Sequence, residues 1–133
     1  MKAARIALAI AALAGGAVPL LAHHSFAAFD RSREVTLKGV VREFQWNNPH
    51  AWIQVVVTDD QGRETEWGLE CGSPNMMART GWKRTTLKAG DKVVAVANAL
   101  RDGRPNASLV SITLPDGRTL GPGDAPPPIR RSR

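Results

Sequence analysis

The sequence predicts an all-β domain: a small five-stranded OB-fold-like barrel with one short helix between strands three and four. Three observations lead to this fold class. Apolar residues recur at every second position in short runs, Gly, Pro, Asn and Asp separate these runs, and a single helix-like segment interrupts them. Three strands, a helix and two strands are the element order of an OB-fold. An open five-stranded sandwich is the alternative that the same alternation allows.

The first three strands are predicted over residues 34–46, 50–58 and 64–71. Gly39 lies in the middle of the first strand, where a bulge or sharp bend would fit. Asn47-Asn48-Pro49 ends that strand, and Asp59-Asp60-Gln61-Gly62 predicts a hairpin turn before the third. The inner positions of the third strand are predicted to be Thr65, Trp67, Leu69 and Cys71.

The hydrophobic period changes after the third strand. Ser73 and Pro74 predict an N-cap followed by proline at the first helical position, and Gly81 predicts a helix end in the left-handed region. We therefore expect one short helix over residues 74–80. The fourth and fifth strands are predicted over residues 92–100 and 107–114, joined by a polar turn.

Residues 1–22 are predicted to be a secretory signal peptide. Two basic residues precede a short apolar run, and two glycines and a proline interrupt that run before Ala22. A membrane anchor needs about 20 unbroken apolar residues, which this segment lacks. We therefore expect an exported protein, periplasmic or secreted, with no membrane span after cleavage behind Ala22.

Cleavage would leave one domain over residues 23–120 and a disordered Pro- and Arg-rich tail over residues 121–133. The whole chain has a formal net charge of +6, but the positive excess lies mostly at its two ends. A nucleic-acid partner is therefore not expected for the folded part. The single cysteine, Cys71, excludes an intramolecular disulfide and is expected to be buried and inert.

The mature N-terminus carries the metal-binding hypothesis. Cleavage after Ala22 would give His23 a free α-amine beside its imidazole, and this pair chelates a metal near neutral pH. His24 adds a second imidazole, and copper, as Cu(II), favours such nitrogen-rich surroundings. His50 is the third candidate ligand, because an arm folded back along the barrel would bring His23 near it. The alternatives are a frayed arm and a His50 that serves only as a hydrogen-bonding residue.

The outer face of the second strand predicts a different kind of site. Trp52 shares this face with His50 and Gln54, and an exposed ring there would stack on a sugar or a base. Arg101 and Arg104, in the loop between the fourth and fifth strands, would add positive charge. Such a face would bind a glycan or another polymer. Alternatively, Trp52 fills space beneath the N-terminal arm.

The remaining large side chains are predicted to pack the barrel and its mouth: Trp46, Trp67, Trp82, Met76 and Met77. Phe26 and Phe29 would dock the arm onto the face that carries Trp52. The acidic positions of the third strand are expected to meet Lys38 or Arg42 across the sheet. No nucleophile triad, phosphate loop or pair of catalytic carboxylates is recognisable, so no enzymatic activity is predicted.

The sequence contains five distinctive motifs: HHSFAAFD at residues 23–30, NNPHAW at 47–52, GSPNMMARTGW at 72–82, LKAGD at 87–91 and TLPDGR at 113–118. In these motifs the chain resembles a family of small exported bacterial proteins that is catalogued as a domain of unknown function. The resemblance implies an exported single-domain β-barrel protein without an assigned activity. The residues themselves predict a non-catalytic binding module with copper as the favoured ligand. A glycan- or polymer-binding domain and an accessory subunit of an envelope complex are the alternatives.

Overall fold

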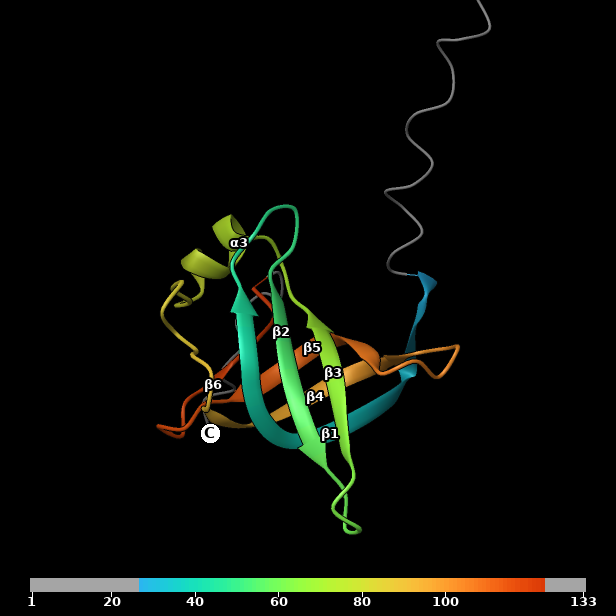
Figure 1. Cartoon of the computed structure of the whole chain (residues 1–133). Helices are drawn as coiled ribbons and strands as arrows, with labels where there is room; N and C mark the ends of the chain where they lie inside the picture. The colour runs from blue at the N-terminus through green and yellow to red at the C-terminus, as the bar shows by residue number, and fades with distance from the viewer. Residues whose placement is uncertain (1–26, 124–133) are drawn as a thin grey trace, which may run out of the picture.

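The computed structural model describes residues 27–123. The predicted signal peptide, His23, His24, Phe26 and residues 124–133 of the predicted tail lie outside the described residues. The elements follow one another along the chain as shown in Figure 1: β1 (Phe29–Gln45), β2 (Trp52–Thr58), β3 (Glu64–Glu70), α3 (Pro74–Arg79), β4 (Lys92–Leu100), β5 (Asn106–Thr113) and β6 (Thr119–Leu120).

Five strands form a closed ring. They are hydrogen-bonded in the order β3-β2-β1-β4-β5, and a parallel pairing of β3 with β5 closes the ring. The other pairings are antiparallel. This strand order, with the short helix between β3 and β4, is that of an OB-fold, so the predicted fold class is confirmed and the open sandwich is excluded. The two-residue β6, which pairs with the end of β5, was not predicted.

β1 is 17 residues long because it belongs to both halves of the ring. It pairs first with β4 and then with β2, and Val40 has partners on both strands. Gly39 lies at this exchange, where an added Cβ would be 2.4 Å from the carbonyl oxygen of Val56 and 2.6 Å from Val55 Cγ1. Only a residue without a side chain allows the β2 backbone to approach β1 so closely. Gly39 therefore lies at the bend of β1 that the sequence predicts.

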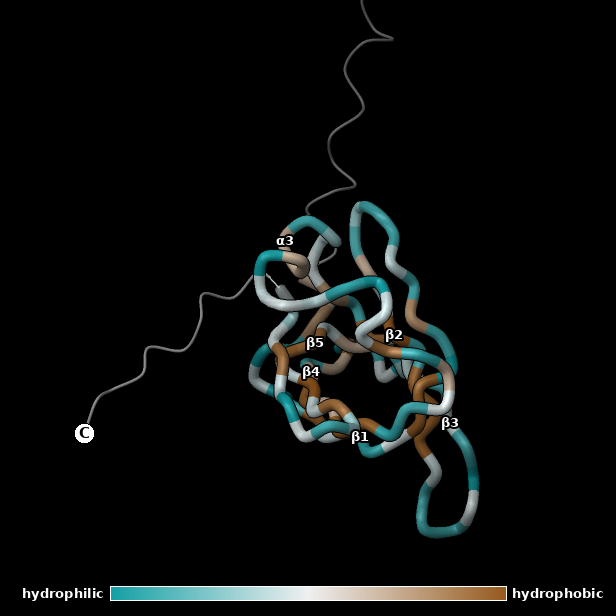
Figure 2. Tube along the Cα trace, turned by 90° about the vertical axis from the view of Figure 1, so that its left-hand side faces the viewer, coloured by the Kyte–Doolittle hydropathy of each residue, from teal (hydrophilic) through white to brown (hydrophobic). Residues whose placement is uncertain are grey.

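Alternate residues of the strands fill the interior of the ring. The ring strands carry the hydrophobic positions in Figure 2, whereas the loops are mostly hydrophilic. On β4, Ala95 and Ala97 are fully buried, and their small size leaves room for larger side chains. Cys71 is 4% exposed, which confirms its predicted burial. The largest fully buried side chains are Trp82, Ile53, Leu69, Met77, Ile112, Val41 and Val55.

Helix α3 closes one end of the ring. The Ser73 side chain accepts a hydrogen bond from the backbone N–H of Met76, and Pro74 begins the helix, as the sequence predicts. Met77 is fully buried, but Met76 is 41% exposed. The packing role predicted for Met76 is therefore wrong, because a helix of six residues turns only one side toward the core. No helix within residues 27–123 is long and apolar enough to cross a membrane.

Residues 121–123 complete the same end of the molecule. The Trp82 indole Nε1 donates to the carbonyl oxygen of Gly121 at 2.9 Å. The backbone N–H of Gly72 donates to the carbonyl oxygen of Pro122 at 2.8 Å. Gly123, at φ +99°, packs against the backbone of Met77, where an added Cβ would lie 2.8 Å from the Met77 Cα. The packed chain thus includes three residues that the sequence assigns to the tail.

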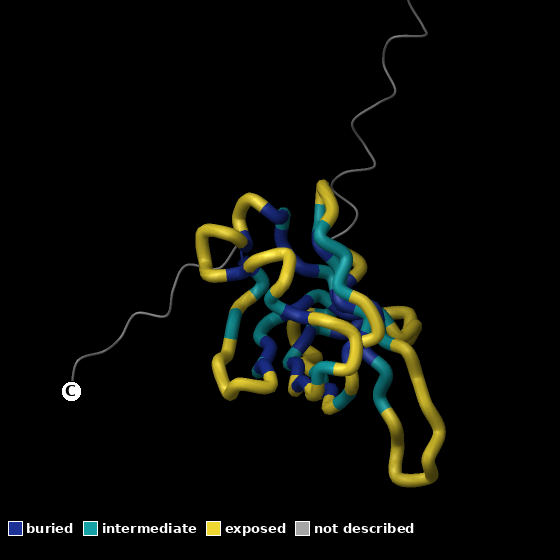
Figure 3. The backbone as a smooth tube through the Cα atoms, turned by 60° about the vertical axis from the view of Figure 1, so that its left-hand side comes forward, coloured by how far each residue is buried: buried dark blue, intermediate teal, exposed yellow. Residues whose placement is uncertain are grey.

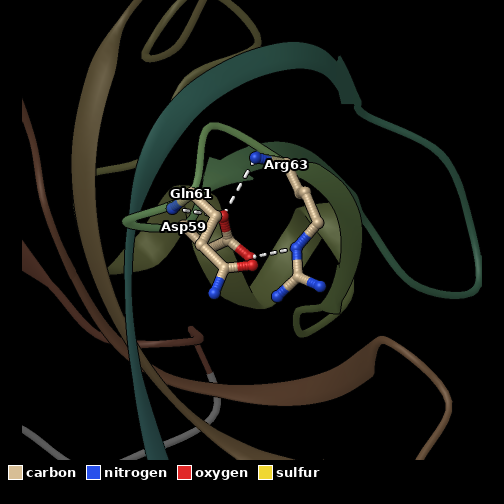
Figure 4. Close-up of polar contacts among 3 residues, drawn as sticks. All are labelled: Asp59, Gln61 and Arg63. Carbon is tan, nitrogen blue, oxygen red and sulfur yellow. Dashed lines mark hydrogen bonds and ion pairs between the residues drawn. The ribbon is translucent and has the colours of Figure 1, made fainter.

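The β2–β3 hairpin projects from the ring, and its tip is exposed in Figure 3. Asp59 shapes this turn, as Figure 4 shows. Its Oδ1 accepts hydrogen bonds from the backbone N–H groups of Gln61 and Arg63, and its Oδ2 lies 2.8 Å from Arg63 Nε. The backbone bond from Arg63, followed by its side-chain bond, lowers the pKa of Asp59 below its ordinary value of 3.8.

We expect the Asp59 carboxyl to titrate at lower pH in the folded chain than in the urea-unfolded chain. Because the pKa of Asp59 is lowered on folding, its carboxylate contributes stability above the unfolded pKa, and that contribution is lost as the pH falls through the folded value. Carbon-13 NMR titration of the side chain measures both midpoints. Identical midpoints in the two states would contradict the geometry of the turn.

Candidate functional site

The outer face of β2 and β3 lies between two loops, residues 46–51 and residues 101–105. In the view of Figure 1 the first loop is at the top and the second is at the right. In OB-folds, these strands and these two loops form the usual binding surface. We refer to the following residues as the candidate face: His50, Trp52, Gln54, Glu70 and Asn106.

His50 is held by Glu70. His50 Nδ1 lies 2.6 Å from Glu70 Oε1, and the two side chains are 30% and 12% exposed. The backbone fixes this approach: Ala51 N–H donates to Gly72 O at 3.0 Å, and Cys71 N–H donates to Ala51 O at 2.9 Å. Because the carboxylate lies beside Nδ1, a metal or polar ligand of this imidazole would be bound by Nε2.

Trp52 is half-buried in the middle of the candidate face. Its Cα partners on the neighbouring strands are Gln45 and Glu70. The next row carries Gln54 and Gly68, and the Oδ1 atom of Asn106 fills the space that a side chain at Gly68 would occupy. An aromatic ring surrounded by amides and one carboxylate can stack on a flat apolar surface and hydrogen-bond neighbouring hydroxyls.

The two arginines of the loop 101–105 have local partners. Arg104 Nε lies 2.8 Å from Asp102 Oδ2, and the Arg104 N–H also donates to Asp102. These two bonds, the backbone bond first, lower the pKa of Asp102. Arg101 donates through Nε to Ala27 O at 3.3 Å. Both guanidinium groups thus have partners at this end of the molecule.

The described chain begins next to that loop. The Arg101 N–H donates to Ala28 O at 3.0 Å, and Phe29 is buried with Leu100 of β4, rather than a residue of β2, as its Cα partner. The first residues of the described chain, blue in Figure 1, therefore leave the ring beside the loop 101–105. The two histidines predicted as metal ligands precede this point by three and four residues.

Within residues 27–123, no group of three or more His, Cys, Asp and Glu side chains is placed to hold a metal ion. Of the three histidines in the sequence, His50 lies within the described residues, and Glu70 is its carboxylate neighbour. A metal bound at His50 would therefore need further ligands from another segment.

Glu70 is the site residue that sequence reasoning missed. The sequence assigns the acidic side chains of the third strand to contacts with Lys38 or Arg42. Arg42 does form an ion pair with Glu66, whereas Glu70 contacts His50. The register of the β2–β3 hairpin could have predicted this contact. Glu70 is the Cα partner of Trp52, and Trp52 follows His50 by two residues.

A family model, described as a family of unknown function (DUF6152), matches residues 10–108. No curated protein matches the sequence. Among solved structures, the mitochondrial single-stranded DNA binding protein Rim1 from S. cerevisiae is similar, with 13% sequence identity, a TM-score of 0.47, and coverage of 62% of this chain and 93% of that chain.

Proposed function

Because the chain belongs to the DUF6152 family, whose function is unknown, we propose a function from its own residues: an exported, non-catalytic module that binds Cu(II) through its mature N-terminal arm and His50. The observation that carries the proposal is the 2.6 Å contact between His50 Nδ1 and Glu70 Oε1. Histidines that ligate metals through one ring nitrogen almost always have such a partner on the other, which fixes the ring.

The remaining ligands would come from the arm. Export and cleavage after Ala22 would place the α-amine and the imidazole of His23 next to the imidazole of His24. These groups lose their protons to a metal near neutral pH, since their reference pKa values are about 8 and about 6.5. Together with His50 Nε2 they form the nitrogen-rich ligand set that Cu(II) favours.

The proposal requires the arm to span the distance from Phe29 to His50. Three strand-to-strand steps lead from Phe29, across β4 and β5, to β3, which is about 14 Å. Glu70 lies about 7 Å further along β3, at about 3.4 Å per residue. His23 lies six positions before Phe29, and an extended segment of that length spans about 20 Å. These lengths allow the contact only when the arm is extended from Phe29, so the bonds that Ala27 and Ala28 accept from Arg101 would be released on binding.

The test is calorimetric titration of Cu(II) into matched chains. A chain that begins at His23 should bind at least about tenfold more tightly than one with an extra alanine before it, because the extra residue removes the amine from the chelate. His50→Gln should also weaken binding, and Glu70→Gln should weaken it about tenfold, the typical effect of losing the partner of a ligating histidine.

Glu64→Gln is the control for this titration. It removes the same charge from the exposed start of β3, away from His50, and should leave the Cu(II) affinity unchanged. Equal affinities of the chains with and without the extra alanine would refute the amine chelate. A wild-type affinity in His50→Gln would remove His50 from the site.

A neutral glycan is the second candidate ligand for the same face. The half-buried Trp52 ring and its amide neighbours favour it, whereas the ion pair of Arg104 with Asp102 does not favour a polyanion. Affinity electrophoresis in neutral polysaccharides should then show retardation that Trp52→Ala abolishes. Retardation that is unchanged in Trp52→Ala would reject this function.

A further inference from the structure

A groove of about 810 Å³ lies where β1 changes its partner from β4 to β2. None of the residues of the candidate face lines it. The described chain has three exposed large hydrophobic side chains, and two of them, Val40 at 40% and Val94 at 37%, belong to this groove. Val56 and Leu114 extend its apolar lining. Apolar side chains thus stay open to solvent in a hollowed part of the surface.

The groove also carries uncompensated positive charge. Lys38 and Lys92 belong to its lining, both are exposed, and neither forms an ion pair within residues 27–123. Asp91 is the carboxylate among the lining residues, and Lys88 binds it through Nζ at 2.9 Å and through its backbone N–H at 3.0 Å. The negative charge of Asp91 is therefore matched by Lys88, and the two other lysines are left for an anion.

We propose that this groove binds a small anionic amphiphile, with a carboxylate headgroup at Lys38 and Lys92 and a linear hydrocarbon chain along the exposed valines. The alternation of lysine and valine side chains places the charge of the ligand next to its apolar part. Val40 is the Cα partner of Lys92, and Val94 is the Cα partner of Lys38. One headgroup can therefore contact both lysines while the chain covers both valines.

The size of the groove favours a small ligand over a protein partner. Sites for small molecules enclose about 300–1,000 Å³, and this groove lies within that range. A stable protein interface covers about 800 Å² on each partner and involves 20 to 30 residues a side. The apolar part of the groove consists of four valines, one leucine and one proline, which is far less than such an interface needs.

The proposal is tested by titrating the isotope-labelled protein with decanoate below its micelle-forming concentration, and with decanol as the uncharged match. The amide signals of Gly39 and Gly90, which line the groove, should shift saturably, whereas that of Gly68 on β3 should not. Lys38→Gln combined with Lys92→Gln should weaken decanoate binding about tenfold. The control, Lys83→Gln with Arg84→Gln, removes the same charge after α3 and should change nothing.

Four results would overturn the proposal. These are the absence of saturable shifts at Gly39 and Gly90, equal affinities for decanoate and decanol, an unchanged affinity in the variant that lacks both groove lysines, and an equal loss in the control variant. Binding of an acidic peptide at the groove without binding of decanoate would assign this surface to a protein partner instead. A Cu(II) titration of the same variants is expected to be unchanged, so this test is independent of the proposed copper site.

Discussion

Trp82→Ala is expected to lower the free energy of unfolding by about 4 kcal/mol, within the range measured for the truncation of large buried aromatic residues. Trp82 is 1% exposed, and its ring lies 5.6 Å from that of Phe44, measured between centroids. Its removal would leave a large cavity under α3 and deprive the Gly121 carbonyl oxygen of its indole donor. Residues 121–123 would then lose much of their attachment to the ring.

Urea denaturation followed by circular dichroism measures this loss. Trp52→Ala is the matched control, because it removes the same side chain from the half-buried outer face and should cost less than about 1.5 kcal/mol. A Trp82→Ala variant within 1 kcal/mol of the parent chain would show that the indole does not close the end of the ring.

Gly39→Ala is expected to lower the free energy of unfolding by about 3 kcal/mol. The added methyl group would lie 2.4 Å from the carbonyl oxygen of Val56, which is backbone and is fixed by the pairing of β1 with β2. The clash can be relieved only if the two strands separate at the point where β1 changes its partner. That movement breaks ladder hydrogen bonds rather than shifting one flexible side chain.

Gly121→Ala provides the control for Gly39→Ala. An added Cβ at Gly121 would meet only the Val110 carbonyl oxygen at 4.0 Å, an ordinary contact, and this substitution should change stability by less than about 0.5 kcal/mol. Thermal and urea unfolding of both variants give the comparison. Equal stability of the two variants would contradict the close approach of β2 to Gly39.

The strands with strict alternation could be predicted from the sequence. β4 runs over Lys92–Leu100, as predicted, because buried and exposed positions alternate along most of its length. β1 begins at Phe29 rather than Glu34, since Phe29 pairs with Leu100 of β4, whereas residues 30–33 show no hydrophobic period and the register shifts across them. β6 has two residues, too few for any period. Local pattern therefore locates the core strands and misses the segments that tertiary pairing adds.

The candidate site was predictable in part. His50 and Trp52 stand out by residue type, but the approach of Glu70 depends on the register of β2 and β3 and on the loop that precedes β2. The contact of Arg104 with Asp102 could have been predicted from a local motif. The sequence Asp-Gly-Arg occurs at residues 102–104 and again at 116–118, and in both turns the arginine Nε lies 2.8 Å from the aspartate.

Pulsed electron paramagnetic resonance of the Cu(II)-loaded chain that begins at His23 tests the central claim most directly. The account predicts modulation from the imidazole of His50 together with nitrogen coupling from the N-terminal amine, and it predicts that His50→Gln removes the first contribution and keeps the second. A spectrum that is the same in the parent chain and in His50→Gln would contradict the joining of the arm to the ring that Glu70 orients.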